Sequence, residues 1–206
     1  MPRVAATPDV RESVLDAATR LMERNGYKKM TMEAIAHEAG IGKATIYGYF
    51  NNKEDVALSV VQRHQEAIRA RWSEIAKSEG PPDHRLREML VTLVLWGFDK
   101  AQRYRQSMDD TLASLRHISL RRRRQFYSEL ALILGTVLAE GRDRGLFCSC
   151  AFEPAARALI TGVSGLNPTN LSPEELGERK EIEERAHQIV DLMLTGLLSR
   201  GWPNQR

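Results

Sequence analysis

Apolar residues recur three and four positions apart in several stretches of this 206-residue chain, which is the periodicity of amphipathic α-helices. The first stretch begins at Thr7-Pro8, a pair typical of a helix start because proline is favoured at the first helical position. Its apolar positions continue to Met22, and Gly26 is expected to end the helix. The pattern therefore predicts an N-terminal helix over residues 8–25.

Residues 31–53, TMEAIAHEAGIGKATIYGYFNNK, hold two short helical patterns separated by glycines. Thr31 is predicted to cap the first of these helices, since its side chain can accept from a backbone N–H of the first turn. Gly40 supplies a residue that tolerates the left-handed conformation at the helix end, and Ile41-Gly42 forms the turn. This arrangement predicts a helix-turn-helix.

The second short helix is expected from Lys43 to Phe50. Ile46 and Phe50 are four residues apart and therefore share one face, which is predicted to be buried. The remaining positions, among them Lys43, Thr45, Tyr47 and Gly48, face other directions and form a candidate surface for reading bases.

A long helix is predicted from Lys53 to Ala76, with Asn52 as its cap and Asp55 in its first turn. The apolar stripe continues through Ile68, and a helix of about 25 residues would be roughly 37 Å long. Pro81-Pro82 then interrupts the helical pattern. Five further helical segments are predicted, over residues 86–98, 108–115, 119–140, 155–166 and 181–199.

Four consecutive arginines, Arg121 to Arg124, occupy the first turns of the predicted 119–140 helix. Runs of charge usually lie in water, so a solvated basic turn is the first interpretation. Extending the apolar stripe of this helix backward reaches Arg123 or Arg124, which leaves a second interpretation open. In that case a guanidinium faces inward and binds a carboxylate or a phosphate.

Composition narrows the class of protein. The net charge of +3 and the pI near 9.0 are compatible with a nucleic-acid partner without demonstrating one. With no long apolar run and no apolar stretch at the N-terminus, we expect a soluble cytoplasmic protein without a membrane partner. No glycine-rich phosphate loop, Ser-His-Asp order or His-x-x-x-His pair occurs, so no catalytic residue, metal site or cofactor is predicted.

Cys148 and Cys150 are too close in sequence to join distant elements by a disulfide. A Cys-x-Cys pair without a nearby histidine is a poor metal signature. We interpret both as small packing residues, with redox sensing as the alternative, which would require a lowered thiol pKa.

The N-terminal quarter of the chain resembles the TetR family of bacterial transcriptional regulators. The resemblance is carried by Asn25-Gly26-Tyr27, by residues 31–36 and 39–50, and by Asn52 to Asp55. It implies an all-α homodimer in which residues 1–52 form a three-helix DNA-binding domain with the helix-turn-helix. Residues 53–206 then form a helical ligand-binding and dimerisation bundle, entered through the long helix from about 53 to 76. The last two long helices would pair across the dimer.

The resemblance also implies which residues meet double-stranded operator DNA. The residues expected at the major groove or its phosphates are Lys43, Ala44, Thr45, Tyr47 and Tyr49, with Thr31 beside the backbone and Lys53 on a phosphate. Lysine suits guanine acceptors, and hydroxyl groups suit bases or phosphate oxygens. Gly42 and Gly48 depart from the residues that the family often has there.

The function expected from this resemblance is a ligand-responsive repressor that a small molecule releases from a near-palindromic operator. The effector is expected among helices of the C-terminal bundle. The candidate pocket residues are Trp96, Phe98, Met108, Leu112, Arg123, Arg124, Phe126 and Leu130. Two alternatives stay open, namely a dimeric DNA-binding regulator without an effector and a small helical enzyme.

Overall fold

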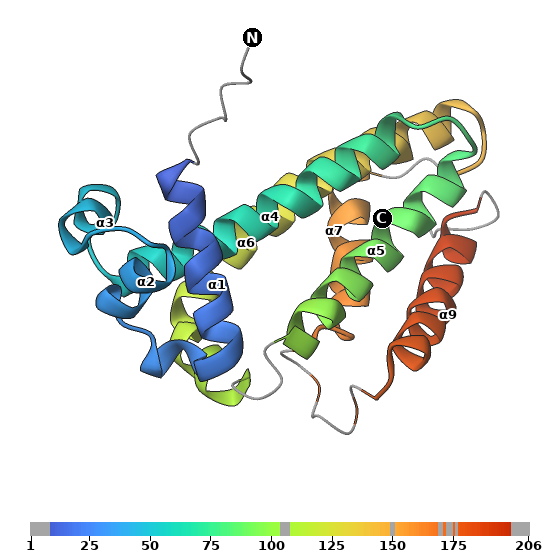
Figure 1. Cartoon of the computed structure of the whole chain (residues 1–206). Helices are drawn as coiled ribbons and strands as arrows, with labels where there is room; N and C mark the ends of the chain where they lie inside the picture. The colour runs from blue at the N-terminus through green and yellow to red at the C-terminus, as the bar shows by residue number, and fades with distance from the viewer. Residues whose placement is uncertain are drawn as a thin grey trace, which may run out of the picture. The chain divides into compact units, whose positions relative to one another are not determined.

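The computed structural model describes residues 9–103, 108–148, 151–168, 171, 175 and 177–198 (Figure 1). Within these ranges the regular elements are helices and no strand occurs, so the predicted all-α class is confirmed. The helices are α1 (Val10–Lys29), α2 (Met32–Glu38), α3 (Lys43–Tyr49), α4 (Lys53–Lys77), α5 (Pro82–Arg103), α6 (Met108–Asp143), α7 (Phe152–Ser164) and α9 (Arg179–Leu197).

The chain divides into two compact units. The first comprises residues 1–65 and 103–119, and the second comprises residues 66–102 and 120–206. Helices α4 and α6 therefore each contribute residues to both units. The functional division into residues 1–52 and 53–206 stays a prediction.

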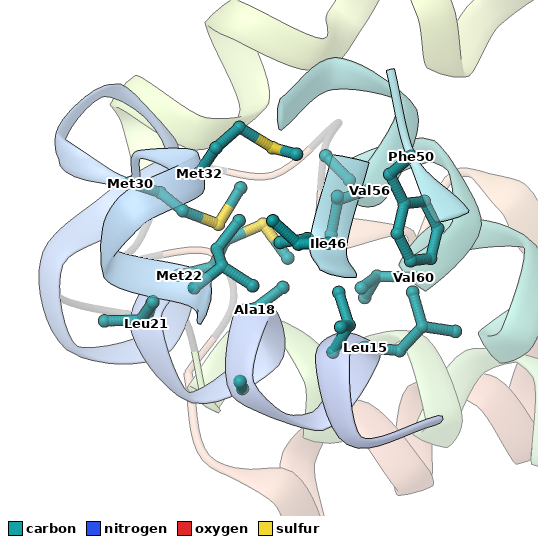
Figure 2. Close-up of a cluster of buried hydrophobic side chains, with 14 of the residues drawn as sticks. Leu15, Ala18, Leu21, Met22, Met30, Met32, Ile46, Phe50, Val56 and Val60 are labelled. Carbon is teal, nitrogen blue, oxygen red and sulfur yellow. The ribbon is translucent and has the colours of Figure 1, made fainter. Parts of the chain in front are cut away.

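The core of the first unit is built by the apolar faces of α1, α2, α3 and the beginning of α4. Figure 2 shows Ile46 of α3 among Met22 of α1, Met32 of α2 and Val56 of α4. Because α2 and α3 are only seven residues long each, burial of their apolar side chains in this core supplies most of their stability. The buried set is Val14, Leu15, Ala17, Ala18, Leu21, Met22, Met30, Met32, Ile35, Ala36, Ile46, Phe50, Val56, Ala57 and Val60.

The first helix begins later than its sequence pattern predicts. It starts at Val10 rather than Pro8, and Asp9 is its N-cap, with a carboxylate oxygen that accepts from the Arg11 amide at 2.9 Å. Aspartate caps a helix as well as threonine does. The sequence pattern therefore does not decide between Thr7 and Asp9 as the N-cap. At the other end Gly26 interrupts the helix as predicted, because its φ of 76° is a conformation that glycine adopts at little cost.

In the second unit the last part of α4 packs with α5 and α6. Arg85 of α5 is buried, and it donates to the Ala76 carbonyl at 2.7 Å and pairs with Glu140 of α6 at 2.5 Å. The Arg85 guanidinium holds the pKa of Glu140 below its usual range. A buried arginine needs such partners, since an unpaired charge in an apolar core is costly.

Three predicted helix boundaries in the second half of the chain are wrong. Residues 108–115 and 119–140 are not two helices but parts of one, α6, because no glycine or proline interrupts residues 108–134. Helix α7 begins at Phe152 rather than at residue 155, so Pro154 is its third residue. Helix α9 begins at Arg179, where Glu181 accepts from the Glu178 amide at 3.2 Å.

Candidate nucleic-acid interface

The helix-turn-helix forms as the sequence predicts. The Thr31 hydroxyl accepts from the Ala34 amide at 3.1 Å and caps α2. Gly40, at a φ of 68°, lets the chain leave α2, and the Ile41 amide then donates to the Ala36 carbonyl at 2.9 Å. These local hydrogen bonds satisfy the backbone groups that a helix end leaves unpaired.

Helix α3 is anchored by Ile46 and Phe50, both of which are buried. Its start has no side-chain cap, since the N-cap residue is Gly42. An isolated seven-residue helix is marginal in water, so α3 depends on these two anchors for its conformation.

The other faces of α3 are open to solvent. Lys43, Ala44, Thr45, Tyr47 and Tyr49 are all exposed, and the two tyrosines keep 47% and 51% of their accessible surface. Thr31 at the start of α2 is exposed as well. Tyrosine is usually buried more deeply than this, and exposed aromatic groups with a hydroxyl are common in binding surfaces. This exposed face of α3 is the candidate interface.

Lys43 is not isolated on this face. Its ammonium pairs at 2.5 Å with Glu33 of α2, a residue that the sequence pattern did not single out. The hydrogen bond from Lys43 lowers the pKa of Glu33, and the carboxylate raises the pKa of Lys43. No helical spacing relates residues 33 and 43, so only the packing of α2 against α3 reveals the pair.

Lys53 points back toward the end of α1. Its ammonium donates to the carbonyls of Tyr27 at 3.3 Å and Lys28 at 3.2 Å, and it lies 4.7 Å from the centre of the Tyr27 ring. It thus supplies donors to carbonyls that the last turn of a helix leaves unsatisfied. Contact with a DNA phosphate stays a prediction for this residue.

Comparison with known proteins agrees with this local geometry. The sequence profile described as "Bacterial regulatory proteins, tetR family" matches residues 14–60, which contain α2, α3 and the start of α4. The fatty acid metabolism regulator protein of Bacillus subtilis is 24% identical over 192 residues, covering 89% of this chain and 93% of that protein. Residues 14–60 thus match the N-terminal domain of the TetR family of bacterial transcriptional regulators.

Two further comparisons concern the repressor KstR and the solved structure of SmeT. KstR of Mycolicibacterium smegmatis is 32% identical over 83 residues, which cover 40% of this chain and 41% of KstR. The complex of SmeT with triclosan has a TM-score of 0.70 at 23% identity, covering 95% of this chain and 96% of SmeT. SmeT is the repressor of the Stenotrophomonas maltophilia multidrug efflux pump SmeDEF, and its likeness to this chain concerns the fold.

TetR-family proteins bind DNA operators, act as dimers and are not enzymes. The relatives that match this chain are transcriptional regulators and not enzymes, so the alternative of a small helical enzyme is set aside. Across the part of the chain that the structure describes, no helix has the length and apolar character needed to cross a membrane.

The residues predicted to line an effector pocket differ in their surroundings. Phe98, Phe126 and Leu130 are buried, whereas Trp96 is half-buried with the Lys100 ammonium 4.1 Å from the centre of its ring. The side chains of Met108 and Leu112 lie outside the described residues.

The arginine run is only partly exposed where its side chains are described, since Arg122 is half-buried. Arg124 is exposed, and Arg123 is half-buried, with its guanidinium carbon 5.4 Å from the centre of the Tyr127 ring. This environment is that of a partly solvated cation stacked on an aromatic ring. Binding of an anion by either residue stays a prediction.

Trp72 of α4 is a candidate that the apolar pattern of the sequence does not distinguish from other packing positions. The side chain is fully buried in the second unit, and its indole Nε1 has no hydrogen-bond partner among the described residues. A buried donor without an acceptor costs about 1–3 kcal/mol. The buried, unpaired Nε1 is the one feature that distinguishes Trp72 from an ordinary packing residue.

Replacing Gly48 with alanine is expected to raise the free energy of unfolding by about 1 kcal/mol, because alanine is the better helix former. Gly48 lies within α3, and no atom lies within 4 Å of where a Cβ would be, so nothing opposes the change in the free protein. Urea titration followed by circular dichroism measures the effect. An unchanged or lowered midpoint would contradict it.

Replacing Lys53 with methionine is expected to weaken binding to duplexes of every sequence by a similar factor and to reduce the salt slope by about 1. Lys43→Ala or Thr45→Ala should instead change which sequence is preferred. Methionine keeps an unbranched side chain but loses the ammonium over Tyr27 and its donors to α1. Fluorescence anisotropy with several duplexes at varied salt measures the affinity for each duplex and the salt slope. Identical effects from the three substitutions would refute the assignment of Lys53 to a phosphate and of Lys43 and Thr45 to bases.

Proposed function

We propose that the protein is a ligand-responsive repressor that binds a near-palindromic operator as a homodimer and is released by a small molecule. The observation that carries the proposal is the exposed face of α3, held on the buried anchors Ile46 and Phe50. Lys43, Thr45, Tyr47 and Tyr49 supply donors and acceptors suited to base edges and phosphates. In a two-fold dimer the two copies of α3 would address half-sites about 34 Å or more apart.

Helix α4 is the proposed route from effector to DNA. In the first unit Arg63 fastens α4 to α1, through Glu12 at 3.0 Å and Asp16 at 2.7 Å. In the second unit Arg69 fastens it to α6, through Glu129 at 2.5 Å. A molecule that binds the second unit and displaces α4 would therefore move α1 with it. Binding of the effector would then weaken binding of the operator, and binding of the operator would weaken binding of the effector, by the same coupling free energy.

The proposed effector has an apolar body and at least one acceptor oxygen. Phe98, Phe126 and Leu130 supply apolar surface, and the unpaired indole N–H of Trp72 supplies a donor. The relatives are in keeping with this chemistry, since SmeT is known in complex with triclosan and the B. subtilis relative is a regulator of fatty acid metabolism.

The experiment has two stages. The first is selection of bound duplexes from a random pool, which defines an operator. The second is isothermal titration of triclosan and of dodecanoic acid into the protein, with and without that duplex. We expect at least one probe to bind about tenfold or more weakly when the operator is present. Equal affinities, or no binding by any apolar probe, would favour the regulator without an effector.

The dimer interface is proposed on α7 and α9, which pack against each other. Leu192 of α9 is the most exposed large apolar residue of the described chain, at 76%, and Gly162 on α7 is exposed too. Small residues permit close approach of helices, and an exposed leucine gains by being covered.

Leu192→Glu is expected to raise the dimer dissociation constant by about tenfold or more, because it places a charge where the partner would cover an apolar side chain. The matched control is Leu132→Glu on α6, where the leucine is 68% exposed and lies on neither of the two helices. Sedimentation equilibrium measures both variants. A dimer constant unaffected by Leu192→Glu, or affected equally by the control, would exclude this interface.

A further inference from the structure

The acid that pairs with Lys43 lies at the start of α2, next to the residue that caps that helix. Glu33 follows the cap Thr31 by two positions, and its side chain also takes a hydrogen bond from Thr31. Glu33 thus connects Thr31 and Lys43, two residues of the predicted DNA contact. The side chains of Glu33 and Lys43 are 58% and 61% exposed, so the pair lies on the surface and not in the core.

An exposed pair of this kind contributes little to stability, typically about 0.2–1 kcal/mol. A carboxylate in a surface that meets DNA also has a cost, since phosphates repel it. The other acid of α2 is placed differently. Glu38 is held by Arg20 at 2.9 Å and Arg24 at 2.5 Å, both from α1, and it joins two helices of the core. Glu33 has no such role toward α1 among its described partners.

The consequence for DNA binding depends on what Lys43 contacts. An ammonium has three N–H donors, so Lys43 can keep Glu33 as a partner while it donates to the acceptors of a guanine. A phosphate of a random duplex is a different partner. Swinging Lys43 toward it breaks the pair with Glu33 and leaves the carboxylate close to the DNA backbone.

We propose that Glu33 is a specificity-determining residue, which positions Lys43 for a base and penalises its use as a contact to phosphate. This inference rests on the proposed function, because it requires that α3 meets operator DNA. It predicts that Glu33 lowers the affinity for random sequence much more than the affinity for the operator.

The test compares wild type with Glu33→Gln on two duplexes of equal length, the one selected from the random pool and a scrambled version of it. Glutamine keeps the shape of the side chain and removes its charge. We expect affinity for the scrambled duplex to rise about fivefold to tenfold and affinity for the selected duplex to change less than about twofold. The salt slope on the scrambled duplex should steepen by about 0.9, as for one additional phosphate contact.

Two controls separate positioning from a general effect of charge. Glu23→Gln makes the same change of charge on α1 and should raise both affinities by one common factor. In a Lys43→Gln background, Glu33→Gln should no longer alter the ratio between the two duplexes, because the residue it positions is absent.

Equal gains on both duplexes, as in Glu23→Gln, would overturn the inference, and so would a loss of affinity for both. If the proposed function itself were wrong, the wild-type protein would select no duplex from the pool, which is distinct from either of these results.

Discussion

Replacing Ile46 with alanine is expected to lower the free energy of unfolding by about 3 kcal/mol and to abolish measurable operator binding. Ile46 is fully buried, and Figure 2 shows it among core side chains of α1, α2 and α4. Truncation removes apolar contact from three neighbouring helices and leaves a cavity. Because α3 has no side-chain cap at Gly42, little else holds it in a helical conformation.

The matched control is Tyr47→Ala at the next position, which changes an exposed side chain. That substitution should leave stability within about 0.5 kcal/mol while it reduces affinity for the selected duplex. Urea denaturation and fluorescence anisotropy distinguish the two cases. If Ile46→Ala retained both stability and binding, Ile46 would not be the anchor of α3.

Gly141→Ala is expected to destabilise the protein by about 2–3 kcal/mol, although alanine is intrinsically the better helix former. Gly141 is buried in the last turn of α6, and an added Cβ would overlap the ring of Phe147. The ring cannot move freely, because Phe147 is itself buried and the next residue, Cys148, donates to the Leu197 carbonyl of α9 at 3.0 Å.

Gly135→Ala on the same helix is the control. Its Cβ would meet Phe152 at 4.0 Å, an ordinary contact, so this substitution should stabilise the protein by about 0.5–1 kcal/mol. Thermal unfolding followed by circular dichroism compares the two. A second test is the double variant Gly141→Ala with Phe147→Leu, which should lose less stability than the sum of its single substitutions if the ring is the obstacle. If both alanine substitutions stabilised the protein, the Phe147 ring would move away from the new Cβ without a cost in the free energy of unfolding, and the prediction would be wrong.

The residues of α2 and α3 could be predicted from sequence because their signals are local. The Thr31 cap, Gly40 after α2 and the four-residue spacing of Ile46 and Phe50 each act within one or two turns of helix. The same holds for Asn52, whose side chain accepts from the Asp55 amide at 2.8 Å and starts α4. Helix starts elsewhere in the chain were less well predicted where caps compete, as at Asp9 and Glu178.

The sequence by itself determined an all-helical chain, a helix-turn-helix with a solvent-facing second helix, and a resemblance to a family of regulators. Tertiary structure alone decided which charges meet. The pairing of Glu33 with Lys43, of Lys53 with the end of α1, and of Arg85 with Glu140 all join residues on different helices. Periodicity cannot reveal such pairs, because it records which face a residue occupies on its own helix and not which helix packs against that face.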